Sequence, residues 1–285
     1  MYNSIVVGFD ESEFSKAALI EASERIKKYG GKLFLVHAVF FDEEEFGIAP
    51  EQREKRFEFG RRACYLSKDM VASQYGIDME SYVCEGDPPE VIIDIAREKK
   101  ADLIATGTYG RRGLKRLLMG SVTSQVILNS PCDVLVVKRP CSECTGTYIS
   151  ILLPFDGSES SKKALIRACE LAKSDGAMMK VLYVIPRYEE MVEFFRSDSI
   201  KRSLLREADK IIAEAKRITS SYGVPVQTQI REGHAADEIV KTAEKLENDL
   251  IVMCTYGWKG VNKALMGSTT GNVITHAGCP ILVVK

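Results

Sequence analysis

The sequence predicts an α/β protein made of two tandem domains, each built around a five-stranded parallel sheet. Two observations predict this class. Short, continuously apolar runs alternate with helix-like segments along the whole chain, as expected when helices bury both faces of a sheet. The same order of runs, with the same short motifs, then occurs a second time within the 285 residues.

Four short segments occur in the same order in both halves. Their first residues are Ile5 and Ile151, Thr108 and Thr255, Leu118 and Leu265, and Cys132 and Cys279. Only two copies are present and each is long enough to bury its own core, so the pattern indicates tandem domains rather than a solenoid. We expect domains at residues 1–138 and 149–285, joined by a polar linker at residues 139–148.

The first domain is expected to begin with a buried strand and a well-delimited helix. Residues 4–9 are apolar after Ser4, which favours a strand buried on both faces. Apolar side chains recur at helical spacing through residues 13–29. Ser12 can cap the N-terminus of this helix and Gly30 can end it.

The remaining segments continue the alternation of strand and helix. In the first domain, further strands are expected at residues 32–39, 78–84, 102–106 and 134–138, and further helices at residues 50–75, 88–99 and 121–129. In the second domain, strands are expected at residues 149–155, 178–185, 224–231, 249–253 and 281–284. This alternation predicts a doubly wound, Rossmann-like sheet in each half, with strand order 3-2-1-4-5.

Composition and charge argue against several classes of function. The net charge is −1 and the pI is about 6.4, which gives no support to binding of nucleic acid or a membrane surface. No apolar run approaches the roughly 18 residues that a membrane span needs, and the N-terminus shows no signal-peptide pattern. The eight cysteines lie mostly in apolar segments, which favours reduced thiols in a cytoplasmic protein.

The strongest chemical signal is a glycine pattern between residues 107 and 121. Gly107 and Gly110 follow the expected fourth strand, and Gly120 and Ser121 open the next helix. Glycines allow backbone N–H groups to turn inward, and a helix N-terminus offers further unpaired N–H groups. The pattern predicts a cradle for an anion, most simply phosphate. The alternative is two ordinary turns, and a P-loop is absent.

Three further residues belong to the candidate site because of their place in the predicted sheet. Strands one and four are neighbours where the strand order reverses, so Asp10 and Gly107 are expected to converge there. Asp10 can accept hydrogen bonds from ribose hydroxyls or a base, or else it caps the following helix. Val39 can meet a flat base, or else it is a core residue. Arg111 can approach a phosphate, although most such charges are solvated.

Asp10, the spacing Gly107-x2-Gly110-x9-Gly120-Ser121 and the ending at residues 131–138 together resemble the universal stress protein family. Members with this pattern are ATP-binding α/β proteins with five parallel strands, frequently dimers that pair through their last strands. The resemblance implies that Asp10 and the backbone around Val39 hold the nucleoside. The residues implied to hold the phosphates, usually with a divalent cation such as Mg²⁺ or Mn²⁺, are Gly107, Gly110, Gly120, Ser121 and Val122.

The second half keeps only part of this pattern. The residues retained are Asp156, Gly257, Gly267 and Ser268. Cys254 stands where the first glycine is expected, and its side chain would intrude near phosphate and make a positive φ costly. Pro154 replaces Gly8, so the end of that strand can differ. We therefore expect one tightly bound nucleotide per chain, in the first half, and weaker, smaller or no ligand in the second.

The other residue patterns give weaker evidence of a functional site. Cys141 and Cys144 form a Cys-x-x-Cys pair in the expected linker. No second pair follows at zinc spacing and no thioredoxin-like context surrounds it, so an incidental pair is the favoured interpretation. No Ser-His-Asp set or paired carboxylates can be identified from spacing, so neither catalytic nor metal-ligating side chains are assigned.

These features favour an adenine-nucleotide-binding regulatory or stress-response protein that holds ATP in its first half. The expected partner is the nucleotide, with the two halves forming a pseudo-dimer within one chain and a homodimer as a further option. A slow ATPase is the first alternative, because positioned phosphates supply part of phosphoryl-transfer chemistry. A nucleotide-free interaction module is the second, and the intact glycines of the first half oppose it.

Overall fold

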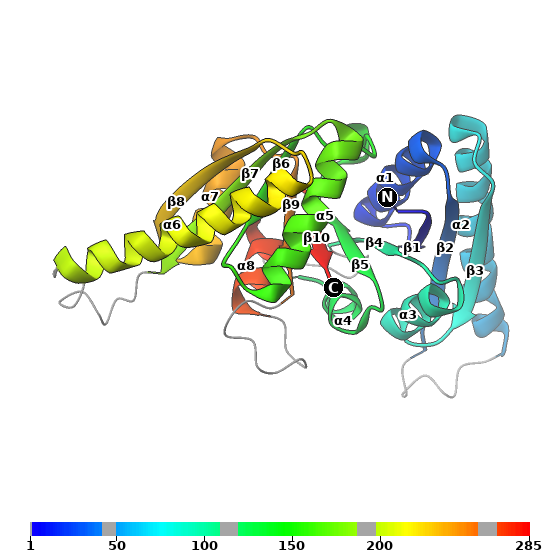
Figure 1. The fold of residues 1–285 in the computed structure, drawn as a ribbon. Helices are drawn as coiled ribbons and strands as arrows, with labels where there is room; N and C mark the ends of the chain where they lie inside the picture. Colours follow the sequence, from blue (N-terminus) through cyan, green and yellow to red (C-terminus); the bar gives the residue numbers. More distant parts are fainter. Residues whose placement is uncertain (1, 42–49, 109–118, 187–197, 256–266) are drawn as a thin grey trace. The chain divides into compact units, whose positions relative to one another are not determined.

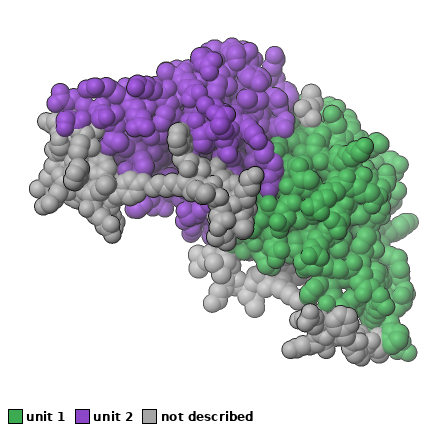
Figure 2. Space-filling view, turned by 60° about the horizontal axis from the view of Figure 1, so that its bottom comes forward, with its two compact units in different colours: residues 1–147 green, residues 148–285 purple. Residues whose placement is uncertain are grey.

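The computed structural model describes residues 2–41, 50–108, 119–186, 198–255 and 267–285 (Figure 1). The chain divides into two compact units, Met1–Thr147 and Tyr148–Lys285 (Figure 2). Each unit alternates strands and helices in the order expected from the sequence. The predicted α/β class is therefore confirmed for both halves.

The first unit is a parallel sheet with a pair of helices on each face: α1 packs with α2, and α3 packs with α4 (Figure 1). Its strands run β3-β2-β1-β4-β5, which confirms the predicted order. The strands are β1 (Ser4–Gly8), β2 (Lys32–Val39), β3 (Met79–Glu85), β4 (Leu103–Gly107) and β5 (Asp133–Val137). The helices are α1 (Glu13–Tyr29), α2 (Pro50–Tyr75), α3 (Pro88–Glu98), α4 (Ser121–Asn129) and the short η2 (Cys141–Glu143).

The second unit repeats this architecture with the order β8-β7-β6-β9-β10, again all parallel. The strands are β6 (Ser150–Pro154), β7 (Met178–Pro186), β8 (Val226–Gly233), β9 (Leu250–Cys254) and β10 (Ile281–Val284). The helices are α5 (Glu159–Asp175), α6 (Asp198–Ser221), α7 (Ala235–Lys245) and α8 (Ser268–His276).

Local sequence signals set the limits of the first helix in each unit. The Ser12 side chain accepts a hydrogen bond from the Ser15 N–H at 3.3 Å and begins α1, while Gly30 ends it with φ at 77°. Ser158 and Gly176 do the same for α5. The side chains of Ala17, Ala18 and the other small residues of α1 are buried, which lets the helix approach the sheet closely.

Residues 139–147, expected to form a linker, lie within the first unit. Arg139 donates to the buried carboxylate of Glu21 on α1, at 2.6 Å. Arg25, one turn further along α1, donates to the carbonyl oxygen of Gly146 at 2.9 Å and lies over the ring of Tyr29. These contacts hold the segment against α1, because buried charged groups require partners.

Among the described helices, none combines the length and the apolar character that a membrane crossing requires.

Candidate functional site

Asp10 lies just beyond β1, at the C-terminal edge of the sheet. One of its carboxylate oxygens accepts two hydrogen bonds from Ser12, from the N–H at 3.0 Å and from the hydroxyl at 2.5 Å. Its own N–H donates to the Ser15 hydroxyl oxygen at 3.3 Å. Asp10 therefore stabilises the turn before α1, which was the alternative role considered from the sequence. These hydrogen bonds also hold its carboxylate in a defined position at the C-terminal edge of the sheet.

Gly107 ends β4 and is a glycine because α1 packs directly against it. A Cβ added at Gly107 would lie 2.6 Å from the Cβ of Phe14 and 3.0 Å from the backbone nitrogen of Ser15. Ser15 also bonds to Asp10, so the structure brings Asp10 and Gly107 together through the first turn of α1, as the strand order predicted. The first reason for a glycine at position 107 is therefore the close packing of α1 on the sheet.

The N-terminus of α4 supplies the donors of the candidate site. Gly120 donates its N–H to the Thr108 carbonyl oxygen at 3.0 Å, and an added Cβ would lie 2.8 Å from that same oxygen. Among the described residues, the N–H groups of Ser121, Val122 and Thr123 donate to no partner. Three unpaired amides at a helix start, with the partial positive charge of the helix dipole, have the chemistry that binds an anion.

Thr123 connects this helix to the strand. Its hydroxyl donates to the Gly107 carbonyl oxygen at 2.7 Å. The contact places the start of α4 beside the end of β4, and through Gly107 beside the first turn of α1. Nearby, the Thr108 hydroxyl is buried without a partner among the described residues. Neither threonine was identified from the sequence as a site residue. Thr123 recurs as Thr270 in the second half, and this repetition is the sequence feature that could have indicated it.

Val39, the last residue of β2, is buried. Its side chain is 4% exposed, and its carbonyl oxygen accepts a hydrogen bond from the Gly86 N–H at 3.2 Å. The side chain thus has the core position that was the alternative at the sequence level. Gly110, Arg111 and Gly257 lie outside the described residues.

The second unit reproduces the described part of this arrangement. Asp156 accepts from the Ser158 N–H at 3.0 Å and from its hydroxyl at 2.6 Å. Gly267 donates to the Thr255 carbonyl oxygen at 3.2 Å, and the Thr270 hydroxyl donates to the Cys254 carbonyl oxygen at 3.0 Å. The first-turn amides of α8, those of Ser268, Thr269 and Thr270, likewise donate to no partner among the described residues.

Two expectations about the second unit are corrected. Neither Gly107 nor Cys254 has a positive φ, because both are the last residues of regular strands, so cysteine causes no backbone strain there. Pro154 does not alter the strand end: Phe155 continues the ladder to the Leu182 carbonyl oxygen at 2.9 Å, as Phe9 does to that of Val36.

The exchange of Gly107 for Cys254 is accompanied by a second exchange. Ser160 occupies the position in α5 that Phe14 occupies in α1, one residue after the first of each helix. The larger strand residue thus faces a helix start with a smaller side chain. This pairing explains how Cys254 is accommodated, because a core tolerates a change in size best when the total volume is kept.

The family assignment rests on the whole length of both units. The sequence model of the universal stress protein family matches residues 1–138 and again residues 147–285. The chain belongs to the universal stress protein family. The tandem arrangement inferred from the internal repeat is thereby confirmed as two copies of one family domain.

Individual universal stress proteins match one half or the whole chain. One from Methanocaldococcus jannaschii is 36% identical over 140 residues, covering 48% of this chain and 82% of that protein. One from Mycolicibacterium smegmatis is 24% identical over 298 residues, covering 99% of this chain and 96% of that protein. The crystal structure of one from Archaeoglobus fulgidus matches with a TM-score of 0.75 at 22% identity, covering 99% of this chain and 96% of that chain. It shows the same fold.

The Cys-x-x-Cys pair of this universal stress protein packs against α1. The Cys144 thiol is 8% exposed and donates to the Ala17 carbonyl oxygen at 3.4 Å, and the Cys141 thiol donates to that of Glu13 at 3.8 Å. Burial raises the pKa of Cys144 from 9.0 to about 12, and the charge of Glu21 adds to the shift. Because the thiolate is the reactive form, this environment favours an unreactive, packed thiol.

We expect a pH dependence of stability from Cys144. The folded pKa of Cys144, about 12, lies above the ordinary 9.0, so ionisation of this thiol favours the unfolded chain. The contribution of the neutral thiol to folding stability is complete below pH 9.0 and is lost as the pH rises toward about 12. Between about pH 8 and about pH 10, wild type should lose about 1.4 kcal/mol more unfolding free energy than Cys144→Ala. Urea denaturation at both pH values measures the difference, and parallel losses would contradict the buried-thiol account.

Proposed function

We propose that the first unit of this universal stress protein binds an adenine nucleotide, with ATP and a divalent cation, Mg²⁺ or Mn²⁺, as the preferred form. The observation that carries the proposal is the set of three unpaired N–H groups at the start of α4, which Thr123 holds beside the end of β4. Asp10 follows the neighbouring strand, β1. The amides fit phosphate oxygens, and the Asp10 carboxylate fits ribose hydroxyls.

The geometry divides the roles within the proposed site. The amides of Ser121, Val122 and Thr123 would receive the phosphates, and the helix dipole would add to their attraction. Gly120 would hold the turn that leads into α4, because an added Cβ would lie 2.8 Å from the Thr108 carbonyl oxygen. Val39 would make the weakest contact with the base, since its carbonyl oxygen already accepts a hydrogen bond from the Gly86 N–H.

The role we propose for the bound nucleotide is regulatory. Occupancy would bias the conformation of the unit or a surface that a cytoplasmic partner contacts during the response to stress. Among the described residues, no three His, Cys, Asp or Glu side chains are grouped as metal ligands. In this proposal the cation arrives with the phosphates, and no side chain is assigned to hydrolysis.

Direct measurement of bound nucleotide is the first test. Purified full-length chain is extracted with acid and the extract is analysed by nucleotide chromatography, and ATP binding to the stripped chain is then measured by calorimetry with Mg²⁺. We expect adenine nucleotide in the extract and one tight site per chain. An empty extract together with no heat of ATP binding would remove the proposal.

A proline at the first residue of α4 tests the amide site without unfolding the helix. Gly120 has φ −59° and ψ 143°, an extended conformation that a following proline accepts, and proline is favoured at the first helical position. Ser121→Pro removes one amide donor and the hydroxyl, so we expect ATP to bind at least about tenfold more weakly.

The chain offers a matched control in its second unit. Ser268 begins α8 after Gly267, whose φ of −57° and ψ of 136° are nearly the same, so Ser268→Pro makes an identical chemical change. The proposal places the tight site in the first unit, and we expect Ser268→Pro to bind ATP like wild type. Equal losses in both variants would show two equivalent sites and overturn the asymmetry. A loss only in Ser268→Pro would transfer the site to the second unit.

A further inference from the structure

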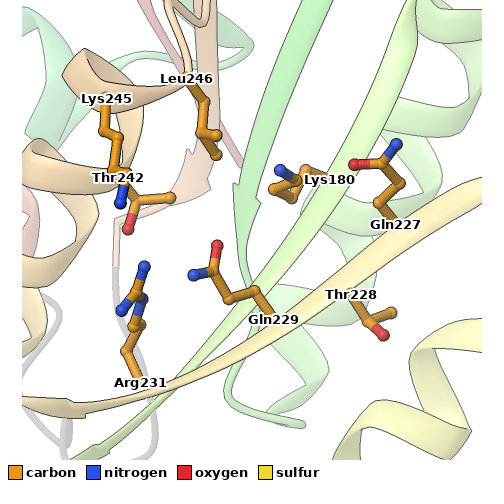
Figure 3. A pocket seen from close by; sticks show the side chains of 8 residues that line it. All are labelled: Lys180, Gln227, Thr228, Gln229, Arg231, Thr242, Lys245 and Leu246. Carbon is orange, nitrogen blue, oxygen red and sulfur yellow. The ribbon is translucent and has the colours of Figure 1, made fainter.

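A pocket of about 330 Å³ lies in the second unit, between strands β7 and β8 and helix α7 (Figure 3). Its lining residues are Lys180, Gln227, Thr228, Gln229, Arg231, Thr242, Lys245 and Leu246. Lys180 and Gln227 lie near the beginnings of their strands and Lys245 is the last residue of α7. The pocket is therefore separate from the second unit's counterpart of the candidate nucleotide site, which lies where β6 and β9 end.

The charge of the pocket has one sign. Among the residues that the structure describes, Lys180, Arg231 and Lys245 line it and no carboxylate does. Within the described part of the chain, none of these three cations forms an ion pair. In Figure 3 the side chains of Arg231 and Lys245 extend toward each other, with Thr242 between them. Three like charges in one pocket repel, and the arrangement is stabilised when an anion enters.

Arg231 is held in position by its neighbour on β8. With its amide in the orientation that satisfies both groups, the Gln229 side-chain oxygen accepts from Nε and Nη2 of Arg231, each at 2.6 Å. The guanidinium is thus oriented before any ligand binds, and its remaining N–H groups can donate to an anion. A preorganised donor loses little freedom on binding, which favours affinity.

The first unit provides an internal comparison, because the register of its strands is the same. Phe34 pairs with Glu80 across β2 and β3, as Lys180 pairs with Gln227 across β7 and β8. Two and four pairs further along, Tyr82 and Cys84 of β3 correspond to Gln229 and Arg231 of β8. On the covering helices, the matching residues are Ile95, Glu98 and Lys99 for Thr242, Lys245 and Leu246.

Aromatic rings and paired charges occupy this place in the first unit. The Lys99 ammonium lies 4.7 Å from the ring centre of Tyr82 and 5.8 Å from that of Phe34. It also pairs with Glu98 at 3.1 Å, and the Tyr82 hydroxyl donates to Glu80 at 2.5 Å. In the first unit, the charged groups at this place are thus paired with one another. The second unit has different residues at the positions of both rings, both carboxylates and the lysine between them.

We propose that this pocket of the second unit binds a small anion carrying several negative charges, borne by phosphate or carboxylate groups. The size of the pocket suits a small molecule. In the described part of the second unit, no aromatic side chain lines the pocket to stack on a base, so we do not expect the ligand to be recognised as a nucleoside. The amides and hydroxyls of Gln227, Thr228 and Thr242 provide hydrogen bonds for the polar remainder of such a molecule.

The test measures binding of two simple probes, inorganic tripolyphosphate and citrate, to the full-length chain by calorimetry at low ionic strength. Two variants restore residues of the first unit: the double variant Lys180→Phe with Gln229→Tyr, which fills the pocket, and Lys245→Glu, which reverses a charge on an exposed residue. Lys241→Gln is the matched control, because Lys241 is a 69% exposed lysine of the same helix that pairs with Glu238 outside the pocket.

We expect wild type and Lys241→Gln to bind at least one of the probes equally well. Each pocket variant should lose one equivalent of binding or bind at least about tenfold more weakly, since it removes charge-assisted hydrogen bonds. Binding of tripolyphosphate alone would identify a phosphate-bearing ligand, and binding of citrate alone a polycarboxylate.

Two results would overturn the proposal. One is the absence of binding of both probes to wild type. The other is a pair of pocket variants that bind as wild type does, which would place any bound tripolyphosphate elsewhere in the chain. Tripolyphosphate bound at the N-terminus of α4 in the first unit would not give the expected result. The pocket substitutions leave that site unchanged, so only binding in the pocket would be lost from the variants.

Discussion

Replacing Glu21 with alanine is expected to lower the unfolding free energy of the first unit by about 3–5 kcal/mol. The Glu21 side chain is 1% exposed and accepts from Arg139 Nη2 at 2.6 Å, and the Arg139 side chain is 9% exposed. Alanine would leave the guanidinium buried without this carboxylate. Breaking one partner of a buried pair costs more than the pair contributes, because the remaining charge stays out of water.

Hydrogen exchange of the α1 amides reports this loss for the first unit alone, which matters because a chain of two units need not unfold in one step. The matched control lies in the second unit and is measured on the amides of α5: Glu170→Ala breaks the Arg167–Glu170 pair at the same 2.6 Å but with side chains 35% and 40% exposed. We expect a change within about 1 kcal/mol there, since exposed pairs contribute little.

A second variant separates lost charge from lost packing. Glu21→Leu combined with Arg139→Met replaces the pair by apolar side chains, and we expect a stability within about 1 kcal/mol of wild type. If Glu21→Ala costs no more than Glu170→Ala, the pair does not hold residues 139–147 against α1. If the double variant is as unstable as Glu21→Ala, the loss comes from packing rather than from an unpaired charge.

Gly107→Cys is expected to destabilise the first unit by about 1–3 kcal/mol, as overpacking does. The new Cβ would lie 2.6 Å from the Cβ of Phe14 and 2.8 Å from its carbonyl carbon, so the first turn of α1 would have to move away from β4. Thermal and urea unfolding measure the change. Gly278→Cys is the control, because a Cβ at Gly278 meets no atom of the described residues within 4 Å and its φ is not positive.

Phe14→Ser is expected to rescue part of this loss. The second unit already combines a cysteine at the strand end with a serine, Ser160, at the matching helix position. A smaller side chain at position 14 would allow the helix turn to shift with less loss of contact. A double-mutant cycle should therefore give a favourable coupling of roughly 1 kcal/mol. Additive losses would show that the two exchanges between the units are independent.

The sequence alone determined the architecture of each unit. Buried apolar runs, helical spacing and the capping residues Ser12 and Ser158 are local signals, and two copies of them in one chain predicted the strand order twice. The glycine pattern likewise predicted the end of β4 and the start of α4. A glycine can be read from the sequence whatever it contacts in the folded chain.

Only the tertiary structure decided what those positions contact. Gly107 is small because Phe14 packs on it, Glu21 finds its partner 118 residues away, and the cationic pocket gathers Lys180, Arg231 and Lys245 from three separate elements. Each of these pairings depends on distances through space between elements far apart in the chain. Residue spacing specifies a strand or helix face, but the residues that meet on that face are set by packing.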